Sequence, residues 1–217
     1  YVRHVLPNHV LLLNKFNVVE HHLLVVTREF EQQTDPINAR DFAATWEVMG
    51  AFPGAGALAF YNCGDASGHS QPHKHVQVVP LPFDPLNPTS PAPFEAAILA
   101  AAATQGCGQA GGVFAAPSLP FQHYCYLLGP EESVTPAALE TMFSAMRTEC
   151  LKHSDSWNLV MTKRWMMMVP RSQERCGDVA LNALGFAGTL LVRSTAELEQ
   201  VRELGPMHIL SQVGVPR

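Results

Sequence analysis

The sequence predicts an α+β fold in which helices flank a mostly antiparallel sheet. Short apolar runs come in pairs joined by brief polar links, and such hairpin-like links pair strands in opposite directions. Helical patterns separate these pairs, in the order strands, helix, strands, helix, strands, helix. The 217-residue chain is 47% hydrophobic and 15% charged, so it can bury a sizeable core and is not disordered as a whole.

Two apolar runs near the start, residues 9–16 and 21–27, predict a β-hairpin. An amphipathic helix follows, because Asn38 and Asp41 form a capping-box pattern and apolar side chains then recur at helical spacing. Residues 57–63 predict the next strand, which ends at a polar, glycine-containing loop.

Residues 73–81 predict the strand that leaves this loop. The segment that follows, residues 82–120, is interrupted by prolines and contains an alanine-rich helical pattern over residues 94–104. We expect residues 82–120 to be an excursion from the core, either a lid or a loose linker.

Strands and helices also alternate in the second half of the chain. Thr135 before a proline opens one helix, and Ser194 with Glu197 forms the capping box of the last one. The strands predicted in this half are residues 121–128, 157–161, 165–169 and 188–192. No internal repeat is visible, so we expect residues 1–217 to form a single domain. Because the chain opens at Tyr1 without a methionine, we expect its start to be missing.

Charge and composition exclude several kinds of partner. The net charge is −5 and no run of Lys or Arg occurs, so we expect neither nucleic acid nor an anionic membrane as a partner. No apolar stretch approaches the roughly 20 residues of a membrane span. The five cysteines are odd in number and form no C-x-x-C pair, which favours a reducing compartment, the cytoplasm.

The strongest chemical signal lies in residues 70–77, which read SQPHKHVQ. His73, His75 and Gln77 are two apart, so on a strand they share one face. Burying two imidazoles and an amide without partners would be costly, so this face is expected to border a polar site. Lys74 points to the opposite face, where a surface role is expected.

Three interpretations of this face remain open from the residues alone. His73 and His75 could bind a metal, which would need further ligands. One imidazole could be a nucleophile towards phosphorus, with its other nitrogen donating to a fixed acceptor and Gln77 donating to a phosphoryl oxygen. The histidines could also form a structural polar cluster. The glycines and serines of the preceding loop favour the nucleophile, since successive backbone N–H groups could converge there on an anion.

Residues 62–77 match the pattern N-x-G-x-x-S-G-x-S-Q-x-H-K-H-x-Q, which resembles the signature of the fungal-type ATP adenylyltransferases. These are the diadenosine tetraphosphate phosphorylases, a branch of the histidine-triad superfamily. The likeness extends to other segments, namely residues 11–19, 23–36, 59–64, 169–172 and 181–192. The resemblance implies one histidine-triad-like nucleotidyltransferase domain.

By this resemblance, His75 is the nucleophile that becomes adenylylated, and Gln77 and His73 are the other catalytic residues. The residues implied to bind substrate are Lys15, Asn62, Gly68, His69, Ser70, Gln71, Thr162, Met167 and Arg171. His69 departs from the family pattern, in which a small residue is more familiar. His21, His22 and His123 are left without a role.

The resemblance implies phosphorolysis of diadenosine tetraphosphate to ATP and ADP through a covalent AMP–histidine intermediate. The partners are therefore a dinucleoside polyphosphate, ATP, ADP and phosphate. Related hydrolases carry histidine at the position of Gln77, and an amide cannot pass protons, so transfer is favoured over hydrolysis. We expect no tightly bound cofactor and no metal held by the chain; Mg²⁺ or another divalent cation accompanies the polyphosphate. A hexose-1-phosphate uridylyltransferase-like enzyme and a catalytically silent nucleotide-binding protein are the alternatives.

Overall fold

An eight-stranded sheet forms the centre of the computed structural model, which describes residues 1–217 except 6, 17–18, 55, 85, 87–90 and 108–110. The order of its strands is β1-β2-β3-β5-β4-β7-β8-β6, and each pairing is antiparallel. The strands are β1 (Arg3–Val5), β2 (His9–Leu13), β3 (Leu23–Thr27), β4 (Ala57–Cys63), β5 (His75–Pro80), β6 (Tyr124–Leu127), β7 (Trp157–Met161) and β8 (Trp165–Pro170). The predicted α+β fold and the predicted hairpin of residues 9–16 and 21–27 are confirmed.

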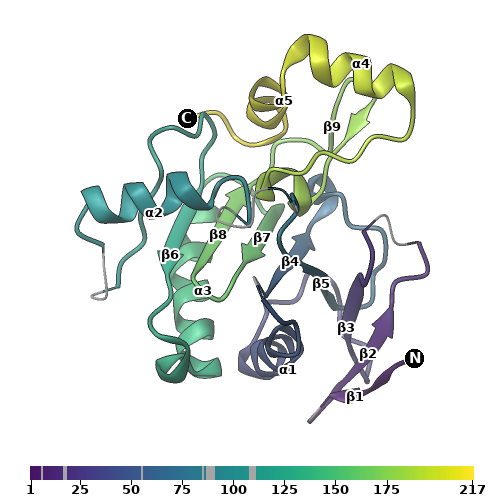
Figure 1. Ribbon diagram of the computed structural model, residues 1–217, viewed down its shortest axis with the longest axis vertical. Helices are drawn as coiled ribbons and strands as arrows, with labels where there is room; N and C mark the ends of the chain where they lie inside the picture. Colours follow the sequence, from purple (N-terminus) through teal and green to yellow (C-terminus); the bar gives the residue numbers. More distant parts are fainter. Residues whose placement is uncertain (6, 17–18, 55, 85, 87–90, 108–110) are drawn as a thin grey trace.

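Helices and short elements surround the sheet (Figure 1). They are α1 (Ala39–Gly50), α2 (Glu95–Thr104), α3 (Pro136–Cys150), α4 (Thr195–Leu204) and α5 (Pro206–Val213), with 3₁₀ turns η1 (Asp65–Ser67), η2 (Glu131–Ser133) and η3 (Ala183–Ala187). The two-residue strands β9 (Arg175–Cys176) and β10 (Val179–Ala180) pair with each other. In Figure 1, α4 and α5 lie together beyond one end of the sheet, at the top.

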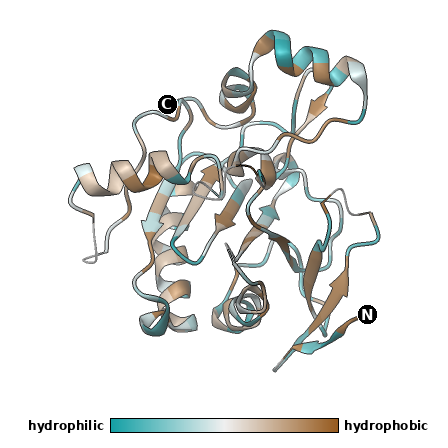
Figure 2. Ribbon diagram, in the orientation of Figure 1, coloured by the Kyte–Doolittle hydropathy of each residue, from teal (hydrophilic) through white to brown (hydrophobic). Residues whose placement is uncertain are grey.

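Alternation along the strands divides the core into two layers. Ala59 and Tyr61 of β4 pack with α1 and α3, whereas Leu58 and Phe60 pack with α2, η3 and α5. All seven residues of β4 are buried because both of its faces are covered. In Figure 2, hydrophobic colour runs along much of the sheet, whereas much of the outlying α4 has hydrophilic colour.

The predicted helix starts are confirmed. The side-chain oxygen of Asn38 accepts from the backbone N–H of Asp41, and the carboxylate of Asp41 accepts from the backbone N–H of Asn38. These two bonds form the predicted capping box of α1. Thr135 caps α3 ahead of a proline, and Ser194 caps α4. None of the helices within the described residues is long and apolar enough to cross a membrane.

Several elements differ from the prediction, among them the unpredicted pair β9 and β10. Residues 188–192 are irregular rather than a strand, since Leu190 and Leu191 pack against the core without a neighbouring strand to pair with. α5 was not predicted, because its eight residues follow α4 after the single break at Gly205.

The segment 82–120 contributes α2 and packs onto the sheet. Ile98 and Ala102 of α2, together with Phe114 and Ala116, are buried in the layer that contains Phe60. These contacts are those of a packed layer rather than a loose linker. A role as a lid stays a prediction, and part of the segment lies outside the described residues.

Candidate active site

His75 is the first residue of β5, and its ring is fixed by the backbone just before it. Its Nδ1 lies 2.8 Å from the carbonyl oxygen of His73, so Nδ1–H donates and Nε2 keeps its lone pair. Burial lowers the pKa of His75, and the neighbouring imidazoles of His73 and His69 lower it further; the hydrogen bond to His73 acts in the opposite direction but does not offset them. The ring is therefore a neutral imidazole with an unprotonated Nε2, as a nucleophile requires.

Gln33 holds the backbone on both sides of this ring. Its side-chain Oε1 accepts from the N–H of His75 at 2.9 Å, and its Nε2 donates to the carbonyls of Asn62 at 3.0 Å and of His75 at 3.3 Å. Only 2% of Gln33 is exposed. Sequence reasoning missed this residue, because no local pattern marks a side chain whose partners lie on distant strands.

Gln77 lies two residues after His75 on the same face of β5. Its Oε1 is 2.9 Å from Nε2 of His22, and Nδ1 of His22 is 3.2 Å from Nδ2 of Asn14. His22 comes directly before β3, the strand that pairs with β5. The structure thus gives the unassigned His22 a place beside the predicted catalytic amide.

The loop between β4 and β5 depends on two glycines at positive φ. Gly64 has φ +84° and Gly68 has φ +77°. A Cβ on Gly64 would come within 2.5 Å of Ser156 Oγ, and one on Gly68 within 2.5 Å of the Leu181 carbonyl. Within the loop, Nδ1 of His69 lies 3.0 Å from the carbonyl of Gly64. Only glycine fits this tight approach of the loop to residues 156 and 181.

A cavity of about 340 Å³ opens beside this loop. Four of the predicted residues line it: Asn62, Gly68, Ser70 and Gln77. Leu184, Leu190 and Leu191 also line it. His75 is 9% exposed and does not itself line the cavity, since it is buried more deeply than Gln77. A lining that combines polar and apolar side chains suits a ligand that carries both phosphate and a flat base.

The remaining residues predicted near the loop lie at its margins. Lys15 is exposed in the turn after β2, where its Nζ lies 5.5 Å from the centre of the Phe16 ring. Gln71 is exposed as well. The ring of His73 turns towards β3, with Nε2 3.1 Å from Thr27 Oγ1, so His73 contacts His75 through its carbonyl.

Thr162 and Met167 are not brought to the cavity. Thr162 follows β7 at the turn into β8, where its Oγ1 accepts from the N–H groups of Arg164 and Trp165. β7 is extended, so Thr162 lies about 13 Å along the chain from Asn158. Met167 pairs with Val160 in mid-strand and is fully buried. Neither residue lines this cavity, and a role for the two in binding substrate stays a prediction.

Arg171 does lie behind the loop, but its guanidinium is already engaged. It donates to the carbonyls of Ser67 at 3.3 Å and Leu181 at 3.2 Å, and to the side chain of Asn158. Asn158 in turn donates to Asn62 Oδ1 at 2.8 Å. Burial lowers the pKa of Arg171 to about 10, which leaves it charged at neutral pH. Arg171 therefore holds the loop against residue 181, and its predicted contact with substrate stays a prediction.

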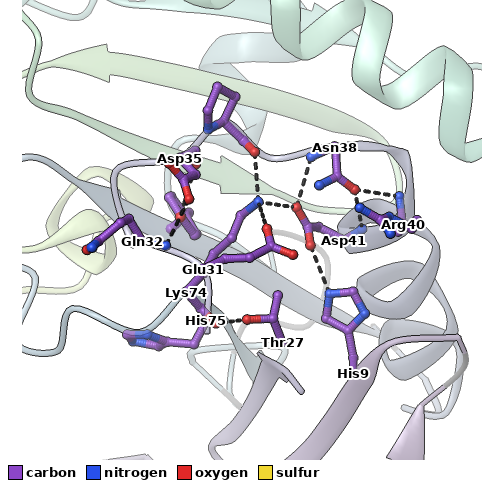
Figure 3. Close-up of polar contacts among 12 residues, drawn as sticks. His9, Thr27, Glu31, Gln32, Asp35, Asn38, Arg40, Asp41, Lys74 and His75 are labelled. Atoms are coloured by element: carbon purple, nitrogen blue, oxygen red, sulfur yellow. Dashed lines mark hydrogen bonds and ion pairs between the residues drawn. The ribbon is translucent and has the colours of Figure 1, made fainter. Parts of the chain in front are cut away.

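Lys74 lies on the opposite side of β5, as predicted, but it is buried rather than at the surface. Its Nζ is 2.7 Å from Asp41 and 3.0 Å from Glu31, and it donates to the carbonyl of Pro36 at 2.8 Å (Figure 3). Burial alone would raise the pKa of Asp41, but the bonds from His9 and Lys74 outweigh this and lower it. The charge of Lys74 is therefore neutralised on the side of β5 opposite to the imidazoles of His73 and His75.

Two further observations bear on alternative sites. A larger hollow of about 860 Å³ lies near α2, α3 and β6, and none of the predicted site residues lines it. Across the part of the chain that the structure describes, no three His, Cys, Asp or Glu side chains are grouped so as to hold a metal ion. The imidazoles of His73 and His75 diverge, because one turns to Thr27 and the other to its own backbone.

Two family models and two curated relatives match this chain. The family model described as the Ap4A phosphorylase N-terminal domain matches residues 1–100, and that of the ATP adenylyltransferase C-terminal domain matches residues 117–216. Diadenosine 5',5'''-P1,P4-tetraphosphate phosphorylase 2 of Saccharomyces cerevisiae is 30% identical over 89% of this chain. The chain spans 65% of the length of that relative.

Solved structures give the same result. The crystal structure of yeast Ap4A phosphorylase Apa2 in complex with AMP matches with a TM-score of 0.78 and 28% identity, over 96% of this chain and 73% of that one. The complex of Apa2 with Ap4A matches equally well, at 27% identity over 96% of this chain and 74% of that one. A uridylyltransferase mutant shares the fold, with a TM-score of 0.50 and 15% identity over 92% of this chain and 88% of that one.

Proposed function

The chain belongs to the Ap4A phosphorylase (ATP adenylyltransferase) family, and we propose that it splits Ap4A with inorganic phosphate to give ATP and ADP. One observation carries the proposal. His75 is neutral, its Nδ1–H is committed to a backbone carbonyl, and Gln77 stands on the same strand face at a cavity of suitable character. Yeast Apa2 was crystallised with AMP and with Ap4A, which supports nucleotides as the ligands of this cavity.

The reaction proceeds in two displacements at one phosphorus atom. Nε2 of His75 attacks the α-phosphorus of Ap4A; the N–P bond forms, the P–O bond to the remaining phosphates breaks, and ATP leaves with the electron pair. An oxygen of inorganic phosphate then attacks the same phosphorus, which releases ADP and returns the electron pair to Nε2. The ring gains positive charge in the intermediate, and the carbonyl of His73 stabilises that charge through Nδ1–H.

Gln77 contributes a donor to a non-bridging oxygen of the transferring group. An amide donates without changing its protonation, so it stabilises charge on the phosphoryl oxygens in both displacements. We propose that a divalent cation enters with the polyphosphate and is held mainly by phosphate oxygens, without a tightly bound cofactor. We also place the protein in the cytoplasm, which the five free cysteines support.

The test is the reaction itself. Purified protein with Ap4A, phosphate and Mg²⁺ should yield ATP and ADP in equal amounts by anion-exchange chromatography, and His75→Ala should yield neither. A UDP-hexose in place of Ap4A is the control for uridylyl transfer. Mass spectrometry after addition of Ap4A without phosphate should show an adenylyl adduct on the wild-type chain. A silent binding protein would retain nucleotide without an adduct, and that result would reject the proposal.

A further inference from the structure

The usefulness of Gln77 depends on which end of its amide faces the cavity. The NH₂ group can donate to a phosphoryl oxygen, whereas the carbonyl oxygen would repel one. The two ends have the same shape, so packing alone does not choose between them. The choice must come from hydrogen-bond partners, and the structure supplies a chain of three.

The chain of bonds begins at a backbone N–H, which can only donate a hydrogen bond and never accept one. The N–H of Phe16 donates to Oδ1 of Asn14 at 3.0 Å, which leaves the Nδ2 of Asn14 as the end that faces His22. Since Nδ2 can only donate, Nδ1 of His22 must accept, and the proton of the ring must sit on Nε2. That Nε2–H then donates to Oε1 of Gln77 at 2.9 Å.

As a result, Gln77 presents its NH₂ group to the cavity. Its Oε1 is occupied by His22, so Nε2 is the end left for a ligand in the cavity that both side chains line. One backbone N–H, at Phe16, thus sets the polarity of the amide through two intervening side chains.

The surroundings of His22 preserve this arrangement. Only 5% of His22 is exposed, and its ring lies 5.8 Å from that of Phe60, centre to centre. Burial lowers the pKa of His22; the bond to Gln77 raises it by less, and the nearby His75 lowers it again. A neutral ring is required, because a protonated one would point a second N–H at the donating Nδ2 of Asn14.

We propose that His22 is a positioning residue that, with Asn14, orients Gln77 so that its NH₂ group meets the transferring phosphoryl group. This inference rests on the proposed phosphorolysis. His22 makes no contact with the reacting atoms in this scheme and acts through Gln77 alone. Its loss should therefore lower kcat more than it raises KM, because the bond from Gln77 is needed most in the transition state.

The experiment compares two substitutions of similar size. His22→Gln can place an N–H near the position of the histidine Nε2, whereas His22→Asn reaches only as far as Nδ1. We expect His22→Asn to lower kcat by roughly 10-fold to 100-fold, as loss of an orienting partner does elsewhere. His22→Gln should recover most of that loss. Circular dichroism and urea midpoints of both variants report whether either change has disturbed the fold.

A double-mutant cycle separates positioning from other roles. In a Gln77→Ala background, His22→Asn should change kcat by less than about twofold, because the group that His22 orients is gone. Additive losses would instead mean that His22 acts directly on His75 or on substrate, and would overturn the inference. So would equal kcat for His22→Asn and wild type. If the wild-type chain produces no ATP and ADP, the proposed function fails first, which is a different result.

Discussion

Replacing Lys74 with methionine should destabilise the protein far more than removal of an ion pair at the surface. Lys74 Nζ lies within 3.0 Å of two carboxylates, Asp41 and Glu31, and its side chain is only 2% exposed. Methionine can fill the space of the alkyl chain but leaves the charge of Asp41 buried with fewer partners. After the change, the bonds that Asp41 keeps among the described residues are those from His9 at 2.8 Å and from the Asn38 N–H at 2.9 Å.

The size of the effect follows from that remaining charge. Breaking a buried ion pair by removing one partner generally costs about 3–5 kcal/mol. Because Asp41 retains two donors, we expect the lower end, about 3 kcal/mol in the free energy of unfolding. For a chain of this length that corresponds to a fall in Tm of roughly 6–12 °C.

Urea denaturation at pH 7 measures the loss, with Arg3→Met as the matched control. Arg3 also pairs with a glutamate of α1, Glu47 at 2.8 Å, but both side chains are 47% exposed. That pair should contribute less than about 1 kcal/mol. Asp41→Asn added to Lys74→Met should recover part of the loss, since the fully buried charge of Asp41 is then gone and the remaining carboxylate, Glu31, is 32% exposed. A Lys74→Met variant as stable as Arg3→Met would refute the reasoning.

The same cluster fixes how this difference varies with pH. The pKa of Asp41 is lowered in the folded state, so its stabilising charge is fully present above the pKa of the unfolded chain, about 3.9. It is lost as the pH falls through the lower, folded value. The gap in stability between wild type and Lys74→Met should therefore close in that acid range.

Two further predictions concern the catalytic loop and the nucleophile. Gly68→Ala places a Cβ 2.5 Å from the Leu181 carbonyl at a φ of +77°, so the loop must move. We expect the free energy of unfolding to fall by roughly 1–3 kcal/mol, measured by urea titration. We also expect a higher KM for Ap4A, measured from initial rates. An unchanged KM would show that the loop does not hold substrate. The lowered pKa of His75 should keep its ring neutral below the ordinary histidine value of about 6.5, so the rate of adenylylation should fall only at lower pH. Single-turnover rates from pH 4.5 to 8 measure this, and a fall that begins at or above pH 6.5 would contradict the assignment.

Local chemistry explains which parts of the fold could be predicted. The caps at Asn38, Thr135 and Ser194 were predicted because each depends on residues within one turn. Residues 188–192 are as apolar as a strand, yet a strand also needs a neighbour with free backbone groups, which a single segment does not reveal. The same limit applies to Thr162, whose distance from the site depends on the length and register of β7.

In the site, too, features that depend on neighbours in sequence could be predicted, whereas contacts between distant residues could not. The shared face of His75 and Gln77 follows from strand alternation alone. Their supports, Gln33 and His22, lie 42 and 55 residues away, so nothing near the motif indicates them. Arg171 was found by resemblance as a residue of importance, but its bonds to backbone carbonyls could be seen only in three dimensions.

Two imidazoles of the site, those of His75 and His22, have their proton fixed by a backbone group. The His73 carbonyl keeps the proton of His75 on Nδ1, and the Phe16 N–H, through Asn14, keeps that of His22 on Nε2. In the proposed reaction one anion leaves the phosphorus and another arrives, so neither displacement requires a proton to move at the reacting centre. A site with fixed protons suits such a transfer. It presents the Nε2 lone pair of His75 and the NH₂ group of Gln77 in every turnover, and neither His75 nor His22 has to change its protonation state first.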